Sequence, residues 1–227
     1  MRIIEQSHEI LSPFSRAKGA EMIKRIEVAG RTCYKSEDKM TEESASDFIG
    51  MIIRRGHHSV LEHESLQIRF ITDRGVTHEL VRHRIGIAFS QESTRYCNYK
   101  GGVTFILPVW SHKTLLGDFP DTQIEPPAIG DQDRLWWHSI KDSERFYTAL
   151  LKKGWTPQQA RAVLPNSLKT EIVVTANLRE WRHIFSLRCA KAAHPQMREL
   201  MIPLLVDFME HLPEVFYDIH MGVLNEG

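Results

Sequence analysis

Two segments of the chain alternate apolar and polar residues, and this pattern constrains the fold more than any other feature. In ESLQIRFITDR (64–74), Leu66, Ile68 and Phe70 alternate with polar side chains, and SLKTEIVVTAN (167–177) repeats the pattern. Successive side chains of a strand point to opposite faces, so each segment predicts a strand with one buried face. Such one-sided strands are typical of antiparallel sheets.

The segments between these strands show mostly helical periodicity. Helices are predicted over 13–29 (ending at Gly30), from Thr41 to Gly56, and over 75–84, 133–153 and 156–165, with two more that begin after Asn177 and at Pro195, the last bent by Pro203. VTFILP (103–108) predicts a further strand, and residues 120–131 predict a surface loop. We therefore expect one α+β domain over residues 1–227, with a central, mostly antiparallel sheet flanked by helices.

Composition excludes several classes of protein. The 227 residues carry 29 basic and 29 acidic side chains, and this net charge of zero argues against a protein held on nucleic acid by general electrostatics. Three cysteines without C-x-x-C spacing indicate a reducing compartment, and no run of about 18 apolar residues predicts a membrane span. We expect a cytoplasmic protein whose anion sites, if any, are local.

The stretch GHHSVLEHE (56–64) concentrates histidines and glutamates just before a predicted strand. His57, His58, Glu62 and His63 could bind a metal, and a metal-dependent hydrolase is therefore one alternative function. The established H-E-x-x-H pattern is absent, and polar residues that cap a helix end explain the stretch equally well. We expect no metal.

The stretch RHRIGIAFSQESTRY (82–96) combines arginines with many hydroxyl groups. Arg82, Arg84 and Arg95 can pair with phosphate in a bidentate manner, and Ser93 and its neighbours add neutral donors. This composition is typical of a phosphate-binding loop. A solvated basic helix face is the competing interpretation, and a nucleotide-binding or RNA-binding module without catalysis is a second alternative function.

The predicted helix after Asn177 carries a third group of candidates. Asn177 and Glu180 are spaced as a capping pair, Arg188 falls at the helix C-terminus, and His194 precedes the helix that starts at Pro195. Each position has a structural explanation of its own. Together with the two stretches above, these residues favour a role in a binding or catalytic site over a purely structural one.

Taken in order, GHHSVLEH, ITDRGVTHELVRHR, SQESTRY, ARAVLP and NLREWRHIFSLR resemble the flavin-dependent thymidylate synthase family over nearly the whole chain. The matching positions are His57, Ser59 and Glu62, the R-H-R of Arg82, His83 and Arg84, the S-x-R-Y of Ser93, Arg95 and Tyr96, then Arg161, Asn177, Arg179, Arg188, His194 and Gln196. Eight residues separate R-H-R from Ser93, where the family usually has seven, so either Gln91 or Glu92 takes the family's acidic or amide contact.

The resemblance implies that the chain converts dUMP to dTMP with methylenetetrahydrofolate as carbon donor and NADPH-reduced FAD as hydride source. It implies a homotetramer with sites at subunit contacts and no protein nucleophile. The FAD residues would be Ser59, Glu62, Arg82, His83, Arg84, Asn177, Arg179, His183 and His194, and the dUMP residues Glu79, Gln91 or Glu92, Ser93, Arg95, Arg161 and Arg188. Arg188 would polarise the uracil carbonyl, and His57 would position the folate and flavin rings.

Overall fold

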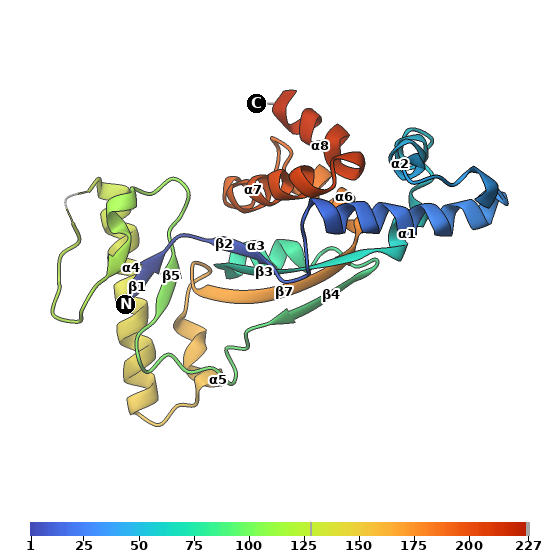
Figure 1. Cartoon of the computed structure of the whole chain (residues 1–227). Helices are drawn as coiled ribbons and strands as arrows, with labels where there is room; N and C mark the ends of the chain where they lie inside the picture. The colour runs from blue at the N-terminus through green and yellow to red at the C-terminus, as the bar shows by residue number, and fades with distance from the viewer. Residues whose placement is uncertain (128, 226–227) are drawn as a thin grey trace. The chain divides into compact units, whose positions relative to one another are not determined.

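The computed structural model describes residues 1–127 and 129–225 (Figure 1). The α-helices are α1 (Arg16–Tyr34), α2 (Ser44–Arg54), α3 (Arg74–Leu80), α4 (Asp131–Lys152), α5 (Pro157–Ala160), α6 (Leu178–Arg188), α7 (Pro195–His211) and α8 (Pro213–Asn225). The 3-10 helices are η1 (Glu37–Lys39), η2 (His58–His63), η3 (Lys113–Leu115) and η4 (Arg161–Val163). The strands are β1 (Arg2–Ile4), β2 (Ser7–Ile10), β3 (Ser65–Asp73), β4 (Ile87–Gln91), β5 (Thr104–Ile106), β6 (Gly117–Asp118) and β7 (Lys169–Asn177).

The strands form two sheets. One has the order β2-β3-β7-β4, and the other has the order β5-β1-β6. The backbone N–H of Asn177 donates to Gly86, and that of Glu92 donates to Glu171, so β7 and β4 run in opposite directions. Strand β1 is antiparallel to β6 but parallel to β5. The expected α+β class with antiparallel pairing is confirmed, whereas the second sheet and its parallel pair were not expected.

The chain divides into two compact units, each built from several segments. The first contains Met1–Ser7, Phe70–Arg82 and Ser90–Ile172, and the second contains His8–Arg69, His83–Phe89 and the chain from Val173 on. The chain passes between the units several times, so no single cut in the sequence separates them. The expectation of one domain over residues 1–227 stays a prediction.

Each unit has its own hydrophobic core. In the first unit, the buried cluster includes Phe105 of β5 and Trp137 and Tyr147 of α4. In the second unit, Phe208 of α7 packs its ring against Phe185 of α6 with the ring centroids 5.1 Å apart. Aromatic side chains bury large areas, so these clusters hold the helices of each unit together.

The two alternating segments form β3 and β7, as predicted. Every second residue of each strand is buried, among them Leu66, Ile68 and Phe70 in β3 and Ile172 and Val174 in β7. The short helix predicted at 156–165 is confirmed in part: Pro157–Ala160 form α5 behind the cap Thr156, whose backbone N–H donates to Gln159, and Arg161–Val163 form the 3-10 helix η4. The predicted loop at 120–131 contains no helix or strand before α4 in its described part; Ala128 lies outside the described residues.

Several predicted helix ends were wrong. Helix α1 starts at Arg16 behind the cap Ser15, and Gly30 lies inside it and does not end it. A Cβ at Gly30 would meet the Phe48 ring at 2.5 Å. Gly30 therefore allows close packing of α1 on α2. Helix α3 stops at Leu80, four residues earlier than predicted.

The remaining differences concern one strand and one helix. Residues Ile87–Gln91 form β4 beside β7, where we expected only a hydroxyl-rich segment, because pairing with a neighbouring strand overrides the weak local pattern. Helix α7 continues through Pro203, and a separate helix, α8, follows it. Among the described residues, no helix combines the length and the apolar character needed to cross a membrane.

The packing of α1 on α7 depends on Gly19, and this generates a test. A Cβ at Gly19 would lie 2.0 Å from the backbone oxygen of His211, so Gly19→Ala should force the helices apart and lower the free energy of unfolding by about 1–3 kcal/mol. Gly222 of α8 is the matched control, because a Cβ there meets nothing within 4 Å. Gly222→Ala should raise the free energy of unfolding by about 0.5–1 kcal/mol. The measurement is urea unfolding of both variants. A Gly19→Ala protein as stable as the parent would contradict the close packing of α1 on α7.

Candidate functional site

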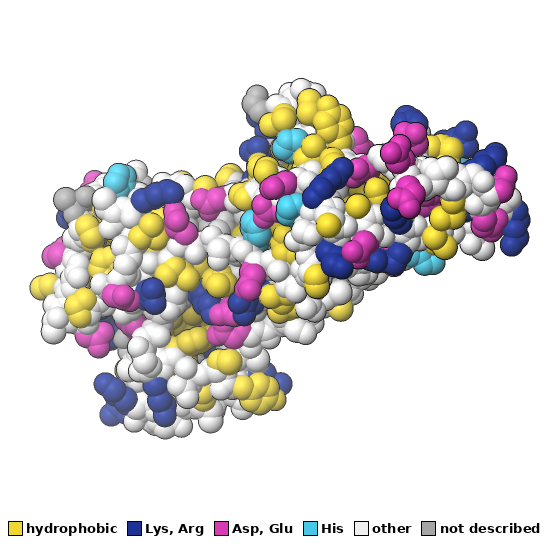
Figure 2. All heavy atoms as spheres, viewed as in Figure 1, with side chains coloured by type: hydrophobic (Ala, Val, Ile, Leu, Met, Phe, Trp, Pro, Cys, Tyr) yellow, Lys and Arg dark blue, Asp and Glu magenta, His cyan; other side chains and the backbone are white. Residues whose placement is uncertain are grey.

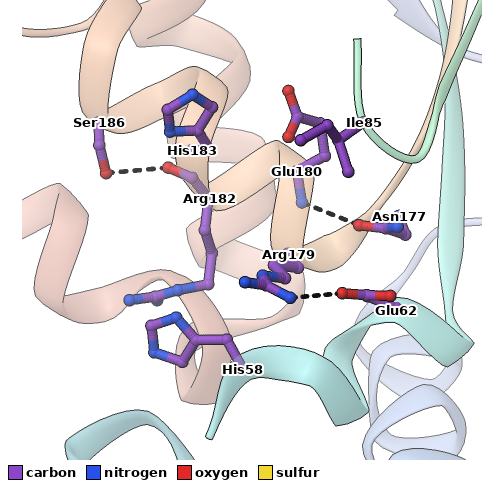
Figure 3. Close-up of a pocket in the computed structure, with 9 residues that line it drawn as sticks. All are labelled: His58, Glu62, Ile85, Asn177, Arg179, Glu180, Arg182, His183 and Ser186. Carbon is purple, nitrogen blue, oxygen red and sulfur yellow. Dashed lines mark hydrogen bonds and ion pairs between the residues drawn. The ribbon is translucent and has the colours of Figure 1, made fainter. Parts of the chain in front are cut away.

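A cavity of about 600 Å³ lies in the second unit, beside the first two turns of α6 (Figure 3). This volume falls within the range of small-molecule and cofactor sites. The cavity is lined by His58, Glu62, Ile85, Asn177, Arg179, Glu180, Arg182, His183 and Ser186. Histidine, arginine and asparagine side chains predominate, so the cavity offers many hydrogen-bond donors.

The start of α6 shapes one side of this cavity. The side-chain oxygen of Asn177 accepts the backbone N–H of Glu180 at 2.9 Å, which confirms the predicted helix cap. The backbone of Asn177 also contacts Gly86, whose φ of +66° brings the chain so close that a Cβ would lie 2.3 Å from the Asn177 amide nitrogen. The N-terminal end of an α-helix is electropositive and favours anions.

Arg179 projects from this first turn and forms an ion pair with Glu62 at 2.6 Å (Figure 3). Both side chains are about half exposed, and an exposed ion pair contributes little to stability. An anionic ligand can therefore compete with Glu62 for the guanidinium at small cost.

His58 faces the same cavity from η2 and was not among the residues predicted for FAD or dUMP. Its Nε2 atom is buried and has no hydrogen-bond partner among the described residues. A buried polar atom without a partner is costly, so a ligand that supplies an acceptor or donor there is favoured. Local sequence carries no signal that distinguishes His58 from its neighbours His57 and His63.

Arg182, the second arginine of the cavity, was not predicted, and it is neutralised within the chain. Its two terminal nitrogens donate to the carboxylate of Asp218 at 2.7 and 2.6 Å, and the pKa of Asp218 is lowered despite its partial burial. We regard Arg182 as a structural link between α6 and α8, and Arg179 as the arginine that can meet a ligand.

A chain of hydrogen bonds links Glu180, which lines the cavity, to His83 and Arg188. The Nδ1 atom of His83 lies 3.0 Å from a carboxylate oxygen of Glu180, and the Nε–H of Arg188 donates to Nε2 of His83 at 3.1 Å. Burial, followed by the positive charge of Arg188, lowers the pKa of His83 to about 4, and burial raises the pKa of Glu180. His83 is therefore neutral at pH 7.

The other residues predicted for FAD lie outside the residues that line this cavity. Ser59 and Arg84 are exposed in the second unit, as is His57, which was predicted to position the folate and flavin rings. The Nδ1 atom of His194 accepts the backbone N–H of Gln196 as the cap of α7. Arg82 is exposed and belongs to the first unit. Of the predicted FAD residues, the cavity brings together Glu62, Asn177, Arg179 and His183.

Most residues predicted for dUMP lie in the first unit, on β4 and the turn after it. Gln91 donates to the hydroxyls of Thr77 and Thr170, and Glu92 accepts from Tyr99 and Lys169. The Ser93 hydroxyl accepts the backbone N–H of Arg95, whose guanidinium is exposed, and Arg161 donates to Thr94 at 3.0 Å. Glu79 is half-buried at the end of α3. Both Gln91 and Glu92 thus have partners within the chain, and the choice between them stays open.

This geometry gives little support to the two alternative functions, a metal-dependent hydrolase and a non-catalytic nucleotide-binding or RNA-binding module. Among the described residues, the group of three potential ligand atoms that converges within 4.8 Å is His83, Glu180 and His183, and not the predicted cluster of His57, His58, Glu62 and His63. Arg188 adjoins His83, and its positive charge opposes a second cation. On the face shown in Figure 2, basic and acidic side chains lie among one another, as the net charge of zero suggests.

Comparison with known proteins identifies the family. Residues 18–214 match the family model described as "Thymidylate synthase complementing protein". The chain is 36% identical over 211 residues to the flavin-dependent thymidylate synthases of Corynebacterium aurimucosum and Mycobacterium avium. Each match covers 89% of this chain, and it covers 82% and 81% of the two relatives.

The fold also matches solved structures. A UMP/dUMP methylase, PolB from Streptomyces cacaoi, bound with 5-Br UMP, superposes with a TM-score of 0.71 over 98% of this chain and 97% of that chain, at 18% identity. The same protein bound with 5-Br dUMP gives a TM-score of 0.71 at 20% identity. These two structures show a shared fold, and the sequence matches show family membership. The chain belongs to the family of flavin-dependent thymidylate synthases.

Proposed function

We propose that this enzyme methylates dUMP to dTMP, with methylenetetrahydrofolate as the carbon donor and NADPH-reduced FAD as the hydride source. The names of its relatives support a flavin and thymidylate, and the name of its structural neighbour supports a uracil nucleotide. In the net reaction, a methyl group replaces the hydrogen on C5 of uracil.

The donor-rich cavity at the start of α6 is the observation that carries this proposal. FAD contains a pyrophosphate, and the cavity offers an anion the positive end of α6, the guanidinium of Arg179 and the buried, unpartnered Nε2 of His58. These features fit the cofactor. Glu62, Asn177 and His183 line the same cavity and would orient it, and bound flavin would supply the hydride chemistry.

The remaining predicted FAD residues need a second copy of the chain. Ser59, Arg82, Arg84 and His194 are exposed, and exposed arginines can complete an anion site on a neighbouring subunit. The enzyme would accordingly be a homotetramer with its sites at subunit contacts. His57 would hold the folate and flavin rings in place. His83 is a different case, because both of its ring nitrogens already have partners within the chain.

The nucleotide would be held by the residues that the family resemblance assigns to dUMP. Arg95 and Arg161 would bind the phosphate together with Ser93, while Glu79 and either Gln91 or Glu92 would contact the nucleoside. Arg188 would donate to the uracil carbonyl and stabilise the charge that develops on the ring. Its Nε–H is held by His83, and a guanidinium has four further N–H donors.

No cysteine needs to attack the pyrimidine in this scheme. Burial raises the pKa of Cys189 to about 12, so its thiol stays protonated and is a poor nucleophile. Cys33 is exposed on α1, and its thiol lies 3.8 Å from the backbone oxygen of Ala29. The raised pKa of Cys189 is the opposite of the depressed pKa that activates a cysteine.

The purified enzyme allows a direct test of this function. It should show a flavin absorption spectrum and convert dUMP to dTMP when methylenetetrahydrofolate and NADPH are both present. Omission of either compound should stop product formation. A colourless protein that binds no added FAD, or a protein that makes no dTMP with all components present, would refute the proposal.

Arg179 should control retention of the flavin. Arg179→Ala removes one charge-assisted contact, worth about 1.5–3 kcal/mol, so the affinity for FAD should fall about tenfold to a hundredfold. Arg25→Ala is the matched control, because Arg25 is equally exposed and also pairs with a glutamate, Glu64. Flavin content after gel filtration is the measurement. Equal flavin in the Arg179→Ala protein and the control would show that the Arg179–Glu62 pair is only a surface contact.

Arg188 should control turnover rather than stability. It is the last residue of α6, where an arginine also stabilises the helix end, so a purely structural role must be distinguished. Arg188→Ala should keep the flavin but lower the rate of dTMP formation by about a hundredfold or more.

Arg198→Ala serves as the control for Arg188, because Arg198 donates to the backbone oxygen of Cys189 at the same helix end. This control should lose only stability, with near-normal turnover. If Arg188→Ala behaves in the same way, Arg188 is merely a helix cap and its role in the reaction is wrong.

A further inference from the structure

Glu180 is a buried carboxylate that neither the family resemblance nor the comparisons assign. It lies in the first turn of α6 with 9% of its side chain exposed, and its hydrogen-bond partner His83 has only 2% exposed. A buried carboxylate is costly unless it is paired, and burial raises the pKa of this one. Its position therefore needs an explanation beyond the favourable helix end.

The hydrogen bonds determine which nitrogen of His83 carries the proton. An arginine side chain can only donate, so the Nε2 atom that receives the Nε–H of Arg188 must be an acceptor. The single proton of the neutral ring then lies on Nδ1, where it points to the carboxylate of Glu180. The pKa of His83 near 4 agrees with a neutral ring.

The order of the three side chains is consequently fixed from carboxylate to guanidinium. Glu180 and Arg188 stand about two turns apart on one rigid helix, and His83 joins them from the segment before β4. The ring of His183 packs edge-on against His83 at 5.4 Å between centroids and restricts its rotation. In many binding and catalytic sites, a hydrogen-bonded carboxylate holds a functional side chain in the orientation that the site requires.

We propose that Glu180 is a positioning residue that, through the Nδ1–H of His83, keeps the Nε2 lone pair turned toward Arg188 and so holds the guanidinium ready for the substrate. The inference rests on the proposed function of Arg188 at the uracil ring. Without the carboxylate, the imidazole can take the other tautomer, in which two N–H groups face each other and the hydrogen bond from Arg188 to His83 is lost.

Glu180→Gln is the variant that tests the inference. Glutamine keeps the size but can donate to Nδ1 of His83, which favours the wrong tautomer. The rate constant kcat should fall about tenfold to a hundredfold with flavin content unchanged, and Glu180→Asp should recover part of the loss because it keeps the charge. In an Arg188→Ala background, Glu180→Gln should cause no further loss, since both changes disable the same group.

Glu214→Gln is the matched control. Glu214 also lies in the first turn of a helix, α8, and pairs with an arginine, Arg16, with 12% of its side chain exposed. If Glu180 acts only through the helix end, both variants should lose similar stability and keep full turnover. That result, or an additive loss in the Arg188→Ala background, would overturn the inference.

The tautomer can be observed directly in the ligand-free wild type, which also covers the case of a variant that fails to fold. Nitrogen-15 NMR with labelled histidine should show His83 protonated at Nδ1 and unprotonated at Nε2, and neutral down to about pH 4. Proton density on Nε2 would overturn the inference. This measurement needs no turnover, so an enzyme that makes no dTMP would refute the proposed function and leave the tautomer result standing.

Discussion

The candidate site depends on the corner where β7 becomes α6. At this corner Asn177 makes two hydrogen bonds: its side chain caps α6, and its backbone holds Gly86. The second contact requires the left-handed backbone and the missing side chain of Gly86, since any Cβ there would collide with Asn177. The segment that carries His83 is thereby placed against α6. Without this corner, neither the cavity nor the buried chain from Glu180 to Arg188 would form.

A chain with no net charge can bind polyanionic ligands only through local arrangements of donors. The three arginines of α6 differ in their burial and in the partners that they contact. Arg182 is buried and fully paired with Asp218, Arg179 is exposed and loosely paired with Glu62, and Arg188 is held by a neutral histidine. The hydrogen bond from Arg188 to a neutral histidine places no negative charge on that side of the guanidinium. This explains why lowering the pKa of His83 serves the site: a charged imidazole would repel Arg188.

The sequence predicted well those features that arise from local periodicity and capping. The strands β3 and β7 follow from strict alternation, and the start of α6 follows from the Asn177 and Glu180 spacing. Strand β4 was missed because its residues alternate only weakly and its pairing partner lies more than eighty positions away. The end of α3 was misplaced because nothing in the local pattern shows that His83 leaves the helix to join Glu180.

The same distinction separates the site residues. Motif order pointed to Glu62, Asn177, Arg179 and His183, and the structure brings these four to one cavity. His58 was named only as a possible metal ligand and Glu180 only as a helix-cap partner, because a buried unpartnered nitrogen and a contact across 97 positions exist only in the folded chain. The roles proposed for residues at subunit contacts can be tested only in an assembly of several copies of the chain.

We propose that the cavity beside α6 holds the pyrophosphate of FAD while Arg188 faces the nucleotide base. A crystal structure of the enzyme with FAD and dUMP would show both ligands. We expect phosphate density within hydrogen-bonding distance of Arg179 and the start of α6, with the uracil ring against the guanidinium of Arg188 and His83 still bonded to Glu180. FAD bound elsewhere with this cavity empty, or a uracil ring remote from Arg188, would contradict it.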